Sequence, residues 1–352
     1  MKLPTTAVEL VDIALAVHDI YIAAAVFSVA NQLQRQALES VMFTKRRDAL
    51  RLASWEHTPV AVLHALSKHK DAAVQLHLAK NQKIINQPLV KKEANSLNVH
   101  ALESVQQAKD MQLPLSIFET LAFHLDAAVR ARTAANTACP TQYLSIFAAD
   151  KSPAVRRALA TRLDIDINIM QQLSTDSDGW VRQRLGRNPS LTEALMQQLA
   201  TDNVDEVRRA ITRNKSCPIK LLEQLAKDSC AWVRAGVAYQ MNASSHLMRR
   251  LALETDIDVL SGVASNLNTP ASILILLAKH DDADVRRGVI LNSKAKRLTL
   301  KPLLQDPYYL HRILLVSNAK LTQSDKWSLH DDPDDRVRFL VFKWLADRLK
   351  RT

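Results

Sequence analysis

The chain has 352 residues, 47% of them hydrophobic and only five of them glycine. Ala, Leu, Arg, Lys and Gln dominate, which is typical of an all-helical protein with tight turns, and the lack of strand-like alternation argues against a β-sheet fold. The formal net charge of +11 favours an acidic partner, whether a protein surface, nucleic acid or lipid head groups, without excluding a class of activity.

The chain opens with an apolar run from Ala7 to Leu33, interrupted by Glu9, Asp12, His18 and Asp19. These charges come too soon for the roughly 20 apolar residues that a membrane helix needs, and no cleavage pattern follows a basic start. We therefore expect no export or membrane segment. Residues 1–47 are predicted to form an N-terminal helical cap, because the end repeat of a solenoid needs a cover for its apolar face.

A repeat with a period of 26 residues organises most of the chain after this cap. One anchor position recurs without a slip at Val129, Val155, Val181, Val207, Val233, Val259, Val285, His311 and Val337. A fixed period of this size predicts an all-α solenoid of about ten to eleven stacked two-helix repeats. We expect it over residues 48–345, irregular at 82–113 and in strict register at 114–345, with residues 346–352 as a basic tail.

Each offset from the anchor has a structural interpretation. Fifteen residues earlier, Pro, Asp, Thr or Ser predicts the start of the first helix, as at Pro114, Asp166 and Thr192. The anchor and the fourth residue after it are apolar and share the core side of the second helix. The seventh is usually Asn, which suits a helix end or a bond to loop backbone. Small residues at offsets three and five predict close packing of successive second helices.

The stretch LATDNVDEVRRAITRNKSCPIKLLEQLAKD resembles two related families, the leucine-rich repeat variant proteins and the HEAT repeats. The resemblance implies a ladder of hydrogen bonds between an Asp five before the anchor and an Arg one after it. The implied pairs are Asp150 with Arg156, Asp176 with Arg182, Asp202 with Arg208, and Asp228 with Arg234. His124 and His280 depart from the Asp pattern and Leu260 from the Arg pattern. The cysteine cluster that holds iron and sulfur in some variant proteins is absent.

Cysteine and histidine spacing gives no metal or cofactor site. Cys139, Cys217 and Cys230 lack a CxxC pair, which indicates reduced thiols of a cytoplasmic protein. His57, His64, His69 and His77 lack zinc-site spacing such as HExxH. No glycine-rich phosphate loop or hydrolase or kinase motif occurs, so we expect no cofactor.

Offsets two and six, with the residue before the anchor, face away from the core and off the flanks of the second helix. They hold residues for which the repeat provides no regular acidic partner: Arg157, Trp180, Arg187, Arg209, Arg213, Trp232, Tyr239 and Arg287. Arginine forks suit an acidic peptide, and interleaved aromatics also suit nucleic-acid stacking. A solvated basic face with locally packed tryptophans is the structural alternative.

The prediction is a non-enzymatic scaffold that binds an acidic macromolecule, a protein ahead of DNA or RNA. A third hypothesis comes from likeness to HEAT-like alkylpurine DNA glycosylases, whose WVR stretch resembles Trp180 to Arg182. It would use Asp178, Asp258 or Asp284, but the repeat produces WVR by itself and no catalytic insertion is found. The oligomeric state stays open, and a monomer is consistent with the sequence.

Overall fold

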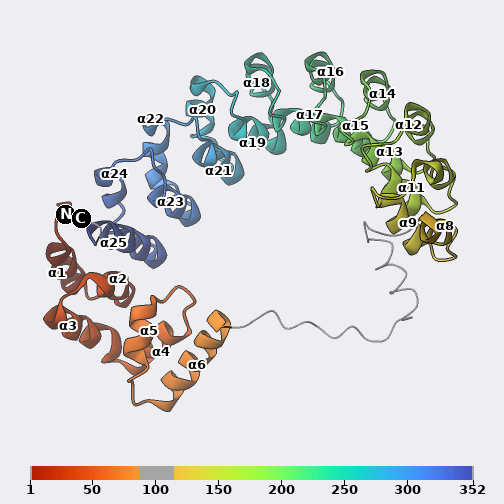
Figure 1. Ribbon diagram of the computed structural model, residues 1–352. Helices are drawn as coiled ribbons and strands as arrows, with labels where there is room; N and C mark the ends of the chain where they lie inside the picture. The colour runs from red at the N-terminus through yellow and green to blue at the C-terminus, as the bar shows by residue number, and fades with distance from the viewer. Residues whose placement is uncertain (1, 87–114, 351–352) are drawn as a thin grey trace. The chain divides into compact units, whose positions relative to one another are not determined.

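All regular structure in the computed structural model, which describes residues 2–86 and 115–350, is helical. Paired helices follow one another in repeat order, so the predicted all-α solenoid is confirmed (Figure 1). Most of the stretch expected to be irregular, residues 82–113, lies outside the described residues, as does the end of the expected basic tail. The first part of that tail, residues 346–349, is the last turn of a helix.

The chain divides into two units, a central unit of residues 93–294 and a terminal unit of residues 1–92 with 295–352. The described hairpins of the central unit are α8 (Leu115–Ala122) with α9 (Ala127–Ala135), η2 (Thr141–Tyr143) and α10 (Leu144–Ala148) with α11 (Pro153–Leu159), α12 (Ile167–Ser174) with α13 (Gly179–Gly186), α14 (Glu193–Leu199) with α15 (Asp205–Thr212), α16 (Ile219–Leu225) with α17 (Ala231–Ala238), α18 (Ser245–Leu251) with α19 (Ile257–Ser265), and α20 (Ala271–Leu277) with α21 (Ala283–Leu291). Each second helix packs on the second helix of the next hairpin. The first helices form a separate layer outside this one (Figure 1).

Helix starts follow the predicted capping position. Asp166, Thr192 and Ser244 are N-caps whose side chains accept a bond from the backbone N–H three residues on. Pro218 and Pro270 occupy the same position without a side-chain bond. Because these residues satisfy or avoid the free amides of a first turn, the hairpin boundaries follow from local chemistry. Pro114, predicted in the same role, lies outside the described residues.

The predicted core positions are buried. The anchor valines of the central unit are fully buried, and so are the apolar residues four later, such as Ile211 and Val237. Small residues let neighbouring second helices approach closely, as predicted. A Cβ built on Gly262 would lie 2.6 Å from the Cβ of Ala238 on α17, and one on Gly288 would lie 2.7 Å from that of Ala264 on α19. Side chains larger than hydrogen do not fit there.

The terminal unit joins both ends of the chain in one stack of hairpins. Its members are α22 (Arg297–Leu300) and η3 (Lys301–Gln305) with α23 (Tyr309–Val316), α24 (Gln323–Trp327) with α25 (Asp335–Leu349), α1 (Ala7–Val17) with α2 (Ile20–Val26) and η1 (Phe27–Val29), α3 (Gln32–Phe43) with α4 (Arg46–Ser54), and α5 (Val60–Leu66) with α6 (Ala72–Asn86). α25 packs along α2, and α1 also contacts α25 (Figure 1). The segment expected to be a cap thus packs as hairpins directly after the last hairpin of the chain.

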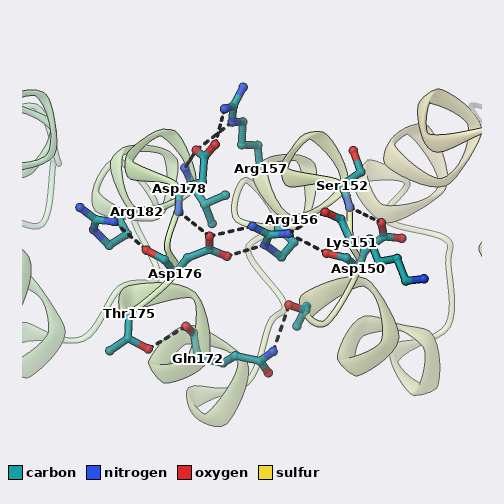
Figure 2. A network of polar contacts seen from close by, with 12 residues as sticks. Asp150, Lys151, Ser152, Arg156, Arg157, Gln172, Thr175, Asp176, Asp178 and Arg182 are labelled. Atoms are coloured by element: carbon teal, nitrogen blue, oxygen red, sulfur yellow. Dashed lines mark hydrogen bonds and ion pairs between the residues drawn. The ribbon is translucent and has the colours of Figure 1, made fainter.

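An arginine ladder ties each second helix to the next hairpin, as Figure 2 shows for Arg156 and Asp176. The Arg156 guanidinium donates to the two carboxylate oxygens of Asp176 at 2.6 and 2.9 Å, and its Nη1 donates to the carbonyl oxygen of Asp150 at 2.6 Å. The same two-sided arrangement recurs at Arg130, Arg182, Arg208, Arg234 and Arg312.

The implied pairs are hydrogen-bonded, but through the carbonyl oxygen of the Asp and not through its carboxylate. The ion pair joins each Arg to the carboxylate 20 residues on, in the following repeat, because the side chain crosses to the neighbouring turn. The Asp of its own repeat offers only a carbonyl oxygen. Each Arg therefore bonds two successive turns, so the contact stabilises the stack as well as the hairpin.

Leu260 and His280 stand at the two positions where one Arg–carboxylate contact of the ladder is missing. They are 20 residues apart, which is the spacing of Arg and carboxylate in every other ladder contact described above. Leu260 is 4% exposed, and His280 keeps the turn by accepting from the Asp282 N–H at 3.0 Å through Nδ1. Because the Arg and its Asp are replaced together, no buried charge is left without a partner.

A second ladder runs along the other end of the second helices. The Asn214 side-chain amide donates to the carbonyl oxygens of Gly186 and Asn188 in the preceding repeat, at 3.0 and 2.7 Å. Asn188, Asn266 and Asn292 repeat this pattern, and Gln240 replaces Asn in one repeat. The bonds reach back 26 and 28 residues, so these amides satisfy helix-end carbonyls of a neighbour. Both predicted roles are seen, because Asn266 and Asn292 are C-caps and the amides bond to backbone, here that of the preceding repeat.

Candidate binding face on helices α13, α15 and α17

The residues predicted to contact a partner lie in or just after successive second helices of the central unit. Arg157 is in α11, Trp180 in α13, Arg209 in α15, Trp232 in α17 and Arg287 in α21, while Arg187, Arg213 and Tyr239 directly follow α13, α15 and α17. The aromatic side chains are open to solvent, at 56% for Trp180, 40% for Trp232 and 51% for Tyr239. The predicted set thus belongs to the layer of second helices (Figure 1).

Arg157 has an acidic partner of its own, although the repeat provides none regularly at this position. Its Nη2 donates to Asp178 Oδ2 at 2.6 Å, and its Nε donates to Asp178 Oδ1 at 3.2 Å. Asp178 also caps α13 by accepting from the N–H groups of Trp180 and Val181. Figure 2 shows this pair beside the ladder. The Arg157 charge is therefore committed within the protein.

Arg209 lies flat on Trp232, with its guanidinium carbon 3.6 Å from the ring centroid. This is a close cation–π contact, which holds the side chain in one place. The Nε of Arg209 is buried and has no hydrogen-bond partner. Because the Nε is buried, at a cost of about 1–3 kcal/mol for the unpaired donor, an incoming acceptor would meet the terminal guanidinium nitrogens.

Arg187, Arg209 and Arg213 form one electrostatic cluster, which we call the arginine cluster. Partial burial lowers the pKa of Arg209, and the nearby charge of Arg213 lowers it further. Burial likewise lowers the pKa of Arg187, with additional repulsion from Arg213 and Arg184. None of the three forms an ion pair among the described residues. Like charges held together without counter-charges make a site that an anion stabilises.

An acidic edge lies next to the arginine cluster. Burial raises the pKa of the Tyr239 hydroxyl, and the carboxylates of Asp258 and Asp284 raise it further. Asp258 is exposed on α19. Its negative charge raises the pKa of Arg209, against the lowering by burial and by Arg213. The positive face is therefore bounded on the α19 side by negative charge. Arg287 on α21 lies beyond this edge, with α17 and α19 between it and α15, so the structure does not bring it to the cluster.

Two further residues shape this site, although the repeat pattern did not assign them to it. Arg184 on α13 was not predicted because its position three after the anchor usually carries a small residue. Asp258 was predicted only in a catalytic role, although its effect here is to limit the basic face. Within residues 2–86 and 115–350, no three His, Cys, Asp or Glu side chains are grouped as metal ligands, and no helix has the length and apolar character needed to cross a membrane.

Comparisons with known proteins identify no family for this chain. No family model and no curated protein matches it. Among solved structures it is similar to a leucine-rich repeat variant with a novel repetitive protein structural motif, at 22% sequence identity over 79% of this chain and 88% of that one, with a TM-score of 0.37. A likeness this distant says nothing about function, so the assignment as a helical-repeat protein rests on the hairpins and ladders described above.

Proposed function

We propose that the protein is a non-enzymatic, cytoplasmic scaffold whose arginine cluster binds a short acidic segment of a partner protein. The observation that carries the proposal is the close grouping of Arg187, Arg209 and Arg213, none of which forms an ion pair within the described part of the chain, with Arg209 held against Trp232. Carboxylates arranged along an extended or helical peptide can accept from such forks, and each charged hydrogen bond contributes about 1.5–3 kcal/mol.

The extent of the face favours a short segment over a nucleic-acid strand. Arg209 already covers one face of Trp232, which reduces the ring surface that a base could stack on. Arg157 is neutralised by Asp178, and the acidic edge at Asp258 and Asp284 would repel phosphates running past Tyr239. A polyanion that spans several repeats would meet both charge signs.

The base-excision hypothesis lacks support at Asp178, one of its three candidate acidic groups. Asp178 caps α13 and is paired with Arg157, and the Arg157 hydrogen bond lowers the pKa of that carboxyl. A strong general base needs a raised pKa and free access to substrate or water. We therefore propose binding without catalysis.

The experiment is a titration of a fluorescein-labelled decapeptide rich in Glu, with duplex and single-stranded DNA and RNA as competitors. We expect Arg209→Glu with Arg213→Glu to weaken peptide binding at least about tenfold, since two charged contacts are reversed. Lys227→Glu with Lys279→Glu, two exposed lysines on the turns that follow the first helices α16 and α20, is the charge-matched control.

Three outcomes would count against the proposal. The first is no peptide binding even at low salt, and the second is equal loss in the cluster and control variants. The third is tighter binding of a nucleic acid with a steep salt slope, which would favour the nucleic-acid alternative. Circular dichroism of each variant shows whether the helices are intact.

A further inference from the structure

The terminal unit contains a cavity of about 930 Å³ that lies where the two ends of the chain meet. One wall is the segment that joins α4 to α5, including Trp55, and the other walls are α23 and α25, through Tyr309, Leu310, Ile313 and Phe339. The volume is at the upper end of the range typical of small-molecule sites, about 300–1,000 Å³. It exists only because the N-terminal hairpins pack on the C-terminal ones.

Aromatic side chains hold the walls of this cavity in place. Trp55 packs edge-on against Phe339 at 4.7 Å between ring centroids, and against Tyr21 on α2 at 4.8 Å. Tyr309 is covered by the Arg336 guanidinium at 3.7 Å from its ring centroid. Rigid aromatic walls provide a preformed apolar space, which reduces the entropy lost when a ligand is bound.

The cations around the cavity are not equivalent. Arg336 is paired with Asp334 through Nε and Nη2, at 3.0 and 2.6 Å, and its Nη1 donates to the Tyr309 hydroxyl at 3.0 Å. Lys343 lies 5.9 Å from the Phe339 ring centroid and has no carboxylate partner among the described residues. Lys343 is therefore the cation that a ligand can use.

The remaining polar groups favour an acceptor on the ligand. The Tyr309 oxygen already accepts from Arg336, so its own proton is available to an acceptor. The single carboxylate on the lining, Glu56, is 77% exposed and lies 3.3 Å from His57 Nε2. Water screens a carboxylate at the rim, and its effect on the interior is small.

We propose that this cavity binds a small amphiphilic carboxylate, with its apolar or aromatic body against Trp55, Leu310 and Ile313 and its carboxylate on Lys343. The cavity is too large for one aliphatic side chain but suits a ligand with one or two rings. This site is separate in sequence and in residues from the arginine cluster, so either proposal can fail alone.

The test is calorimetric titration of the full chain with naphthylacetate and with naphthylethanol. The two share the naphthyl rings, and only naphthylacetate carries a charged carboxylate. We expect one molecule of naphthylacetate to bind per chain. Lys343→Met should weaken naphthylacetate binding about tenfold or more and leave naphthylethanol binding unchanged, because only the carboxylate loses a charged partner. Lys301→Met, at an exposed lysine outside the cavity, should change neither.

Leu310→Trp is a second variant, chosen because Leu310 is 37% exposed and a larger side chain there narrows the cavity without entering the core. It should abolish binding of both ligands while the helical circular dichroism stays unchanged. The proposal is overturned if naphthylacetate does not bind at millimolar concentration, if naphthylethanol binds as tightly, or if Leu310→Trp leaves both unaffected. It is also overturned if a peptide ending in Phe binds through its free carboxylate while naphthylacetate does not.

Discussion

The Arg338 guanidinium on α25 donates a 2.6 Å hydrogen bond to Asp19, which lies 319 residues earlier in the chain. Arg338 also donates to the carbonyl oxygen of Asp332 in its own hairpin, at 2.7 Å. This is the two-sided contact of the arginine ladder, with Asp19 in the place that the next repeat would otherwise supply. The first hairpin of the chain therefore continues the repeat pattern after the last one.

Loss of this terminal contact should destabilise the protein. Replacing Arg338 by Met should lower the free energy of unfolding by about 1–3 kcal/mol, because the pair is only partly exposed and Asp19 would lose its counter-charge. Asp19 would still cap α2 through the Tyr21 and Ile22 N–H groups, so the helix itself should persist. Urea unfolding measures the change. Arg184→Met, at an exposed arginine, is the control. Arg348→Met is unsuited, because the Arg348 guanidinium contacts the Gln323 side chain. Equal stability of the Arg338 variant and wild type would contradict the contact.

The ladder carboxylates of the central unit should contribute more, because their pairs are less exposed. Asp202→Asn removes the charge that receives the Arg182 fork at 2.6 and 2.9 Å. Since both side chains are largely buried, we expect a loss of about 3–5 kcal/mol in the unfolding free energy. Asp281→Asn, at an exposed turn carboxylate without such a fork, should change stability by less than about 0.5 kcal/mol. Similar losses in both variants would show that the ladder ion pairs do not stabilise the protein.

The ladder also predicts how stability depends on pH. Burial by itself would raise the pKa of Asp202, but the Arg182 hydrogen bonds and the Val204 N–H outweigh it and lower the pKa, and the same balance holds at Asp150 and Asp228. A lowered folded-state pKa contributes stability that is present above the unfolded pKa, about 4 for Asp, and is lost as pH falls through the folded value.

Thermal unfolding from pH 7 to pH 2 should therefore show a plateau above about pH 5 and a steep fall below about pH 4. The fall should be shallower in Asp202→Asn, which has one ladder carboxyl fewer. A melting temperature that rises on acidification, or a slope that the substitution leaves unchanged, would be inconsistent with this balance.

The close approach of second helices predicts the effect of one methyl group. Gly262→Ala places a Cβ 2.6 Å from the Cβ of Ala238, which belongs to the neighbouring helix and cannot rotate away. We expect a loss of about 1–3 kcal/mol. Gly179→Ala is the matched control, because its new Cβ would lie 3.6 Å from the nearest Val204 side-chain atom. It should be neutral or slightly stabilising, and destabilisation of similar size in the two variants would contradict the packing.

The three cysteines should differ in reactivity. Burial raises the pKa of Cys139 to about 11 and that of Cys217 to about 12, so both remain thiols at pH 8. Cys230 is partly exposed and donates to Asp205 at 3.3 Å. A disulfide reagent should label one thiol per native chain at pH 8 and three after unfolding. Cys230→Ser should abolish the native reaction, and its persistence would show that a buried thiol is reached.

Much of the fold follows from the 26-residue spacing. The positions equivalent to Val207 and Ile211 are buried, and the positions equivalent to Thr192 start the first helices. These features depend on which residues share a helix face or cap a first turn, and both are local properties of the chain. The period also placed Trp180, Arg209 and Trp232 correctly on one layer of second helices.

The tertiary structure decided which of these residues meet. Arg156 forms its ion pair with Asp176 and not with Asp150, because its carboxylate partner depends on the displacement between neighbouring hairpins, and a strictly periodic pattern is compatible with either. The stacking of Arg209 on Trp232 depends on the same displacement. Arg338 keeps its place in the period, but its partner Asp19 has no periodic signal, because the contact joins chain ends through packing that no local sequence preference describes.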